Sequence, residues 1–363
     1  MNVDDISPSR SINVFHCLTE IKDQSVHQEI QQFLKLENRT LQKLSGIHCS
    51  ALAYMLQMSE TFYGYGSLYF CSKILFSPIR LTGCRLSETH CEVIASALKS
   101  RTSPLKELDL SGNYLEDKHV RILSSGLESP HCGLESLRLI ECSLTMFSFA
   151  PLVLALGSHP SHLRLLNLRG NQLQDSGVEN LCHFLKSPHC QLQKLSLSSC
   201  TLTDQSCSAL VSALKSNPSH LRHLNLSWNH LQDSGVKILC GFLERPDCQL
   251  ETLKLQSCTL SGVSCFYLNS ALNSNPSHLK RMDLSWNQLQ DSGVETLCVF
   301  LQNPHHQLEN LRLRFCGLSE MSCHLLAAVL KSNPATMTNL DLSHNAIQYT
   351  SLEQLRTGRG KHS

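Results

Sequence analysis

Residues 221–231 read LRHLNLSWNHL, a pattern of the form LxxLxLxxNxL in which leucines alternate with polar and aromatic residues. The pattern returns every 29 residues, and every second copy carries Cys where this one carries Asn. Ten copies in one unbroken register exclude chance and indicate a chain built from stacked repeats. The copies start at Phe76, whose copy is degenerate, and then at Leu105, Leu134, Leu163, Leu192, Leu221, Leu250, Leu279, Leu308 and Met337.

One position of the pattern alternates between Asn and Cys, so the full unit is 58 residues long. A side chain buried where the chain leaves a short strand can satisfy backbone groups of the turn, and Asn offers both donors and an acceptor. Cys offers a weak donor and apolar packing, which we favour over a metal or redox role. We expect a structural ladder at Cys84, Asn113, Cys142, Asn171, Cys200, Asn229, Cys258, Asn287, Cys316 and Asn345.

The second half of each repeat has the spacing of a helix. Residues 178–185 place apolar side chains at i, i+3, i+4 and i+7. Ser176 and Glu179, like Ser292 and Glu295, have the spacing of a capping box, and a recurring proline ends each helix. Because helices are wider than strands, the repeats predict an α/β leucine-rich-repeat horseshoe solenoid over residues 76–363, with a parallel sheet on the inner face.

The N-terminal part of the chain does not follow the repeat. Helical periodicity over residues 12–22, 26–36 and 47–58 predicts a short helical segment within residues 1–60. We expect this segment to pack on the first repeat and cover the apolar end of the solenoid. Residues 61–75 are compatible with a strand, a loop or a divergent junction, and these alternatives stay open.

The composition argues against several classes of partner and site. The formal charge is +1 and no long basic run is present, so nucleic acid and acidic membranes are not favoured. The first ten residues are polar, and no apolar run is long enough to span a membrane, which predicts a cytoplasmic protein. We therefore interpret the 18 cysteines as reduced thiols.

Large aromatic residues beside the ladder are the first candidates for contact with a partner. Trp228, Trp286 and Phe315 directly precede ladder residues, and Tyr114 directly follows one. The pattern exposes these positions, and large aromatic side chains supply much of the binding energy at protein interfaces. The alternative is that each ring packs over the neighbouring repeat.

The central strand position carries charged residues that alternate in sign near the C-terminal end of the array. Lys254, Asp283, Arg312 and Asp341 follow one another in successive repeats. Neighbouring strands place such side chains about 5 Å apart. They are candidates for partner contact, but the alternative is a row of charges that neutralise one another across the sheet.

The chain resembles the NACHT and leucine-rich-repeat receptors of innate immunity, including the type expanded in bony fish. The resemblance is carried by residues 11–20 (SINVFHCLTE), residues 50–58 (SALAYMLQM) and the alternating Asn and Cys repeats, which also resemble ribonuclease inhibitor. It implies that residues 1–60 correspond to the end of the helical domain that precedes the repeats in such receptors. The family pattern is interrupted at residues 61–75.

The resemblance implies a non-enzymatic sensing module that binds a protein ligand, or the receptor's own domains in cis, on the concave face. The chain contains no GxxxxGK[ST] phosphate loop, and we find no HExxH or GxSxG motif, so we expect no nucleotide site, no cofactor and no catalysis. The alternative is a free-standing inhibitor similar to ribonuclease inhibitor. Such an inhibitor of cationic ribonucleases should be acidic, which a charge of +1 does not favour.

Overall fold

The computed structural model describes residues 79–348 apart from 102, 104, 159–160, 218–219, 276–277 and 333–336. The expected helical segment (1–60) and the junction (61–75) lie outside the described residues. The described residues belong to two compact units, which we describe separately. The first contains residues 79–171 and Ser187–Gln191, and the second contains Gln172–Lys186 and the residues from Leu192 onward.

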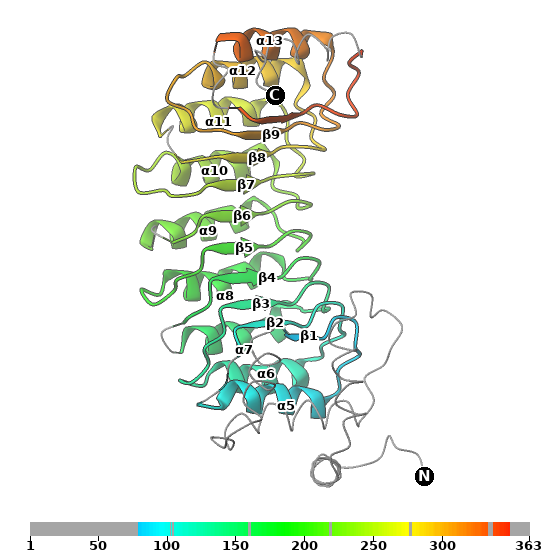
Figure 1. Cartoon of the computed structure of the whole chain (residues 1–363), viewed down its shortest axis with the longest axis vertical. Coiled ribbons are helices and arrows are strands. Elements are labelled where there is room, and N and C mark those ends of the chain that lie inside the picture. Colours follow the sequence, from blue (N-terminus) through cyan, green and yellow to red (C-terminus); the bar gives the residue numbers. More distant parts are fainter. Residues whose placement is uncertain are drawn as a thin grey trace, which may run out of the picture. The chain divides into compact units, whose positions relative to one another are not determined.

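The first unit alternates short parallel strands with helices (Figure 1). Its strands pair in chain order, each with the strand of the following repeat, and its helices pack against one another in the same order. The elements are β1 (Ile79–Arg80), α5 (Glu88–Lys99), β2 (Glu107–Asp109), α6 (Asp117–Leu127), β3 (Ser136–Arg138), α7 (Met146–Gly157) and β4 (Leu165–Asn167).

The second unit continues the same alternation. Leu224 lies opposite Leu253 in the sheet, a shift of one 29-residue repeat, and the other strand pairs of this unit keep this register. Its elements are α8 (Gln174–Lys186), β5 (Lys194–Ser196), α9 (Asp204–Ser216), β6 (His223–Asn225), α10 (Gln232–Leu243), β7 (Thr252–Lys254), α11 (Gly262–Ser274), β8 (Arg281–Asp283), α12 (Gln290–Leu301), β9 (Asn310–Arg312), α13 (Glu320–Ser332) and β10 (Asn339–Asp341).

The leucines of the pattern form the core between strands and helices. In the repeat that starts at Leu221, the side chains of Leu224 and Leu226 are buried. The other described repeats bury the same two positions, except that Leu340 in the last repeat is half-buried. Phe184, Phe242 and Phe300 occupy equivalent places in three helices and are among the largest fully buried side chains. The α/β leucine-rich-repeat solenoid predicted from the 29-residue period is therefore confirmed in both units.

The ladder asparagines satisfy the backbone where each strand ends. The amide nitrogen of Asn229 donates to the carbonyl oxygens of Leu197 and Leu226, both at 2.8 Å, and its oxygen accepts from the backbone N–H groups of Cys200 and Leu202 at 3.0 and 3.1 Å. Asn113, Asn171, Asn287 and Asn345 donate to equivalent carbonyls. Each Asn thereby connects its own repeat to the preceding one.

The ladder cysteines are buried, and their thiols are unreactive. The thiol of Cys258 donates to the carbonyl oxygen of Leu226 at 3.3 Å, and Cys142 and Cys316 make equivalent bonds. Burial raises the pKa of each of these three thiols to about 12. They are therefore protonated at neutral pH and lack the thiolate that nucleophilic attack or metal binding requires.

Three aspartates near the start of a helix reach the next helix of the second unit. The carboxylate of Asp233 accepts the backbone N–H of Ser261 at 2.9 Å, the Ser261 hydroxyl at 2.6 Å and the Ser264 hydroxyl. Asp175 and Asp291, which lie two repeats before and two repeats after Asp233, make the equivalent three contacts. A negative charge is favourable at a helix N-terminus, so each carboxylate stabilises the following helix.

The observed starts of α8 and α12 correct the predicted capping boxes. α8 and α12 already begin at Gln174 and Gln290, before Ser176 and Ser292, so neither serine is an N-cap and that prediction is wrong. The glutamines have positive φ angles of 57° and 56°, and their N–H groups donate to carbonyls of the next repeat. A hydrogen bond between repeats, rather than a local capping box, therefore begins each of these two helices.

Candidate protein-interaction surface

Four aromatic rings form a continuous stack in the second unit. The ring centroids of Trp228 and Trp286 are 6.1 Å apart, those of Trp286 and Phe315 are 3.9 Å apart, and those of Phe315 and His344 are 4.3 Å apart. The last two pairs are stacked, with interplanar angles of 22° and 6°. We call these four residues the aromatic stack.

The aromatic stack remains open to solvent although its rings touch. Trp228 is 50% exposed, Trp286 45% and Phe315 36%. The sequence left two alternatives for these rings, partner contact or packing over the neighbouring repeat, and the rings do contact one another across repeats. The exposed area that remains is of the kind that an interface buries.

The backbone of the aromatic stack lies in a conformation that large residues avoid. The φ angles of Trp228, Trp286, Phe315 and His344 are 61°, 61°, 51° and 61°. Other copies of the repeat place Gly at this position, as at Gly83, Gly112 and Gly170. A residue with a side chain loses about 1–2 kcal/mol in this left-handed region.

A small residue allows the two tryptophans to meet. Ser257 occupies the equivalent position in the repeat between Trp228 and Trp286. Tryptophans two repeats apart start from backbones roughly 10 Å apart at the usual strand spacing, yet their ring centroids are 6.1 Å apart. The rings therefore approach each other across the repeat that carries Ser257.

The sequence analysis did not predict His344 as part of this surface, and it grouped Tyr114 with the other aromatic candidates. His344 directly precedes the ladder residue Asn345, as the tryptophans precede theirs. This shared position and the flat imidazole ring were the signals in the sequence that could have identified it. Tyr114 belongs to the first unit, is 72% exposed and lines a shallow hollow with Lys118 and Thr145. It is absent from the aromatic stack.

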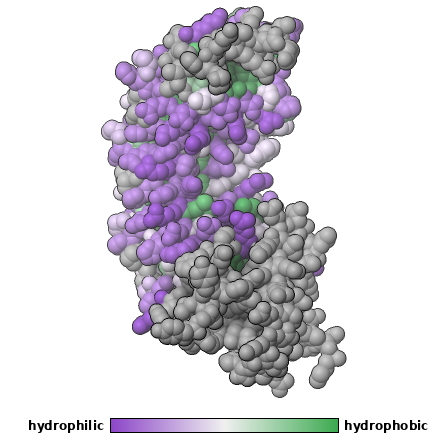
Figure 2. Space-filling view, viewed as in Figure 1, coloured by the Kyte–Doolittle hydropathy of each residue, from purple (hydrophilic) through white to green (hydrophobic). Residues whose placement is uncertain are grey.

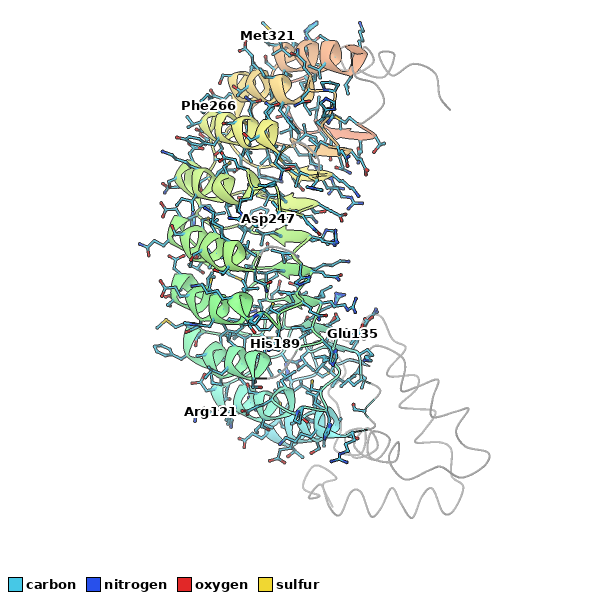
Figure 3. The ribbon with its side chains drawn as sticks, turned by 90° about the vertical axis from the view of Figure 1, so that its left-hand side faces the viewer. Arg121, Glu135, His189, Asp247, Phe266 and Met321 are labelled. Atoms are coloured by element: carbon cyan, nitrogen blue, oxygen red, sulfur yellow. The ribbon has the colours of Figure 1, made fainter. Side chains whose placement is uncertain are left out.

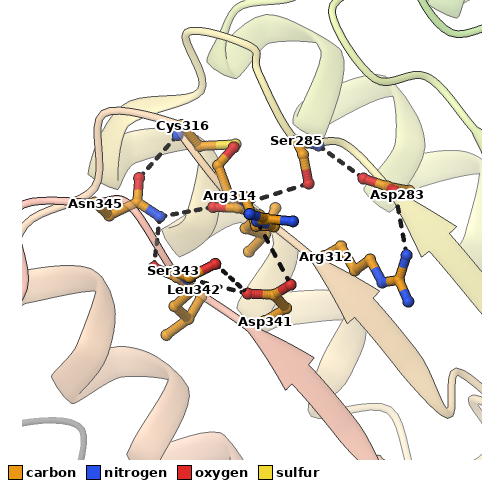
Figure 4. Close-up of polar contacts among 10 residues, drawn as sticks. Asp283, Ser285, Arg312, Arg314, Cys316, Asp341, Leu342, Ser343 and Asn345 are labelled. Carbon is orange, nitrogen blue, oxygen red and sulfur yellow. Dashed lines mark hydrogen bonds and ion pairs between the residues drawn. The ribbon is translucent and has the colours of Figure 1, made fainter.

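The predicted charged row is only partly self-paired. Lys254, Asp283 and Arg312 are neighbours in sheet register, and a guanidinium nitrogen of Arg312 lies 4.0 Å from a carboxylate oxygen of Asp283. Asp341 pairs instead with Arg314, at 3.8 Å, a partner that the central strand positions did not predict (Figure 4). Among the residues that the structure describes, Lys254 has no carboxylate within 4.0 Å.

These strands line an open hollow that we call the cationic hollow. Its polar lining residues are Thr252, Lys254, Arg281, Asp283, Asn310 and Arg312. Three of these side chains are positive and one is negative, and the side chain of Asp283 is only 7% exposed whereas that of Arg312 is 47% exposed. A ligand that enters the hollow therefore meets mainly positive charge.

Neighbouring ionisable groups leave this charge in place. Glu251 accepts a hydrogen bond from Arg222 at 2.9 Å and lies 3.6 Å from Lys280. Burial raises the pKa of Glu251, but the hydrogen bond from Arg222 and the charge of Lys280 outweigh this effect and bring the pKa below its usual value. The carboxyl therefore stays ionised and bound to these two partners. Burial lowers the pKa of His223, which shares a hydrogen bond of 2.9 Å with Thr252.

Other exposed apolar side chains lie on the helices. Phe266 and Met321, both 60% exposed, project from the helical side of the repeats (Figure 3). The face visible in Figure 2 is largely hydrophilic with small hydrophobic patches. The aromatic stack is thus the cluster of exposed rings that best matches an interaction surface.

Two other kinds of site are absent from the described residues. No group of three or more His, Cys, Asp or Glu side chains there could hold a metal ion. No helix there combines the length and apolar composition needed to cross a membrane.

Comparison with known proteins places the chain among leucine-rich-repeat proteins. A family model described as "Leucine Rich repeat" matches residues 159–182, 189–211, 217–240, 275–298 and 333–355, and one described as "Leucine Rich Repeat" matches residues 104–125. Ribonuclease inhibitor of Sus scrofa is 34% identical over 349 residues, which cover 90% of this chain and 75% of that protein.

Two larger relatives match along their repeats only in part of their length. NACHT, LRR and PYD domains-containing protein 14 of Mus musculus is 38% identical over 78% of this chain, and protein 12 of the same series from Homo sapiens is 39% identical over 76%. The chain spans only 28% and 26% of these two relatives. With its repeats and its coverage of ribonuclease inhibitor, the chain belongs to the leucine-rich-repeat family that includes ribonuclease inhibitor and the repeat regions of NACHT, LRR and PYD domains-containing proteins.

Proposed function

We propose that this chain is a non-enzymatic protein-interaction module and that its aromatic stack binds a protein partner. The single observation that carries the proposal is the set of exposed, mutually stacked rings held on left-handed backbone. This backbone destabilises each residue that has a side chain, and Gly occupies the same position elsewhere in the chain. Three consecutive ring contacts at such positions are better explained by binding than by folding.

The module's place in the cell is the finer part of the proposal. We propose that it is the sensing region of a cytoplasmic receptor of the NACHT and leucine-rich-repeat class, with an external protein or the receptor's own domains as its partner. Support comes from the relatives that carry NACHT and PYD domains. The 15 cysteines among the described residues are all reduced, which supports a reducing compartment.

The test is a comparison of proteins captured from cytosol by the full chain and by a Trp228→Ala/Trp286→Ala variant. Loss of both rings should lower recovery of the specific partner at least about tenfold, because truncating a central aromatic residue commonly weakens binding by about 2 kcal/mol or more. A Phe266→Ala variant removes an exposed ring from α11 and should leave recovery unchanged. Equal recovery with the double variant and the intact chain sinks the proposal.

A second candidate function is inhibition of a ribonuclease. The relative from Sus scrofa favours it, because the chain covers 75% of a protein described as ribonuclease inhibitor. The cationic hollow opposes it, since a positively charged surface repels a positively charged enzyme. Tight inhibition of a pancreatic-type ribonuclease by the full chain, measured by substrate cleavage, would reverse the order of the two candidates.

A further inference from the structure

We infer that the partner of the second unit presents an acidic segment, with a carboxylate in the cationic hollow and an apolar or aromatic side chain against the aromatic stack. The inference rests on the proposed function and adds the chemistry of the partner. It concerns a surface defined by two features, the cationic hollow and the aromatic stack, which share the repeats that carry Trp286 and Phe315.

The first step is the charge that the protein itself leaves unbalanced. Asp283 accepts the backbone N–H of Ser285 at 3.1 Å and pairs with Arg312, so its carboxylate is already engaged (Figure 4). Lys254 and Arg281 are exposed, and neither has a carboxylate within 4.0 Å among the described residues. Two positive charges therefore remain for a group from outside.

The second step excludes the nearby carboxylates as internal partners. Glu251 is held by Arg222 and Lys280, and its depressed pKa keeps it ionised in that contact. Asp341 is held by Arg314 and by the hydroxyl of Ser343, which donates at 2.6 Å. These two carboxylates are thus committed to partners outside the cationic hollow.

The third step is the spacing of the two features. Trp286 follows Asp283 by three residues, so their Cα atoms are at most roughly 10 Å apart. A partner segment in an extended conformation covers the same distance with about three residues. We therefore expect its acidic residue and its apolar or aromatic residue to lie two to four positions apart.

The fourth step favours a protein over single-stranded nucleic acid. Cations beside exposed rings can also bind nucleic acid, whose bases stack on open ring faces. Here Trp286 and His344 stack on Phe315 at 3.9 and 4.3 Å, so its faces are engaged. Of the positive lining residues, Arg312 is paired with Asp283, so Lys254 and Arg281 remain, which suits a single carboxylate better than a row of phosphates.

The experiment is a selection from a random twelve-residue peptide library displayed on phage, with the full chain as bait. The intact chain should enrich peptides that carry Asp or Glu near an aromatic or large apolar residue. A Lys254→Glu/Arg281→Glu variant should lose that acidic preference. A peptide recovered with the intact chain should bind the variant about tenfold more weakly, because like charges then oppose each other across an exposed interface.

A matched control separates the hollow from the net charge. Lys186→Glu/Lys215→Glu changes the total charge by the same amount at the last turns of α8 and α9, and it should keep the acidic preference. Far-ultraviolet circular dichroism confirms that each variant is folded. Loss of the preference in this control as well, or its persistence in the Lys254→Glu/Arg281→Glu variant, overturns the inference.

Two further outcomes distinguish this inference from the proposed function. Peptides that are apolar without any acidic enrichment, and that depend on Trp228 and Trp286, overturn the acidic partner but leave the proposed function intact. Peptides that bind the Trp228→Ala/Trp286→Ala variant as well as the intact chain overturn the proposed function. Tight binding of a fluorescein-labelled 20-nucleotide oligothymidylate that the charge reversal abolishes assigns the hollow to phosphate and rejects a protein carboxylate.

Discussion

At the scale of single residues, the repeat backbone and its side chains have separate requirements. The position before each ladder residue has a positive φ angle in every described copy, whether it holds Gly, Ser, Glu or an aromatic residue. The turn thus dictates the conformation, and Gly would satisfy it at lowest free energy. The turn therefore does not require the aromatic side chains of the second unit, and we attribute their presence to the exposed surface that they form.

This separation predicts an unusual order of stability at Trp228. Trp228→Gly should unfold at a higher urea concentration than Trp228→Ala, by about 1 kcal/mol in the free energy of unfolding, because only Gly adopts the left-handed region without strain. Both variants should lose partner binding. Equal stabilities, or a more stable Ala variant, would show that the strain is not borne at this residue.

At the scale of elements, hydrogen bonds between successive repeats position the helices. Asp175, Asp233 and Asp291 each bind the N-terminal turn of the following helix. Burial raises the pKa of each carboxyl, but hydrogen bonds from the serine and threonine residues of that turn outweigh this effect, so the pKa lies below its usual value. The ionised form is therefore bound more favourably in the folded protein than in the unfolded chain.

The stability of these helix junctions should depend on acid pH. A carboxyl with a lowered folded pKa stabilises the protein above its unfolded pKa of about 4, and this contribution disappears as the pH falls through the folded value. Asp233→Asn should therefore be less stable than the intact chain at pH 6, and the difference should shrink as the pH is lowered toward 3. Urea unfolding at a series of pH values measures it, with Glu107→Gln, which removes an exposed carboxylate of β2 outside these junctions, as the control.

At the scale of the whole chain, periodicity predicted the scaffold far better than the surface. A leucine at a fixed position in each of ten repeats reports the average environment of that position, so the strands, helices and buried ladder followed from the 29-residue interval. Contacts between particular side chains about one repeat apart depend on rotamers, which the interval does not specify. The stacking of His344 on Phe315 and the pairing of Arg314 with Asp341 were therefore not predicted.

The central claim, that a protein partner covers the aromatic stack, has a direct spectroscopic test. The chain contains only two tryptophans, Trp228 and Trp286, and both belong to the stack. Replacing them with 5-fluorotryptophan during expression gives two fluorine resonances, which Trp228→Phe and Trp286→Phe variants assign.

Titration with the captured partner or a selected peptide then reports on this surface alone. We predict that both fluorine resonances shift as the complex forms and that both lose their sensitivity to exchange of water for deuterium oxide. Two resonances that stay in place and keep that sensitivity, while size-exclusion chromatography shows the partner bound, would contradict the account.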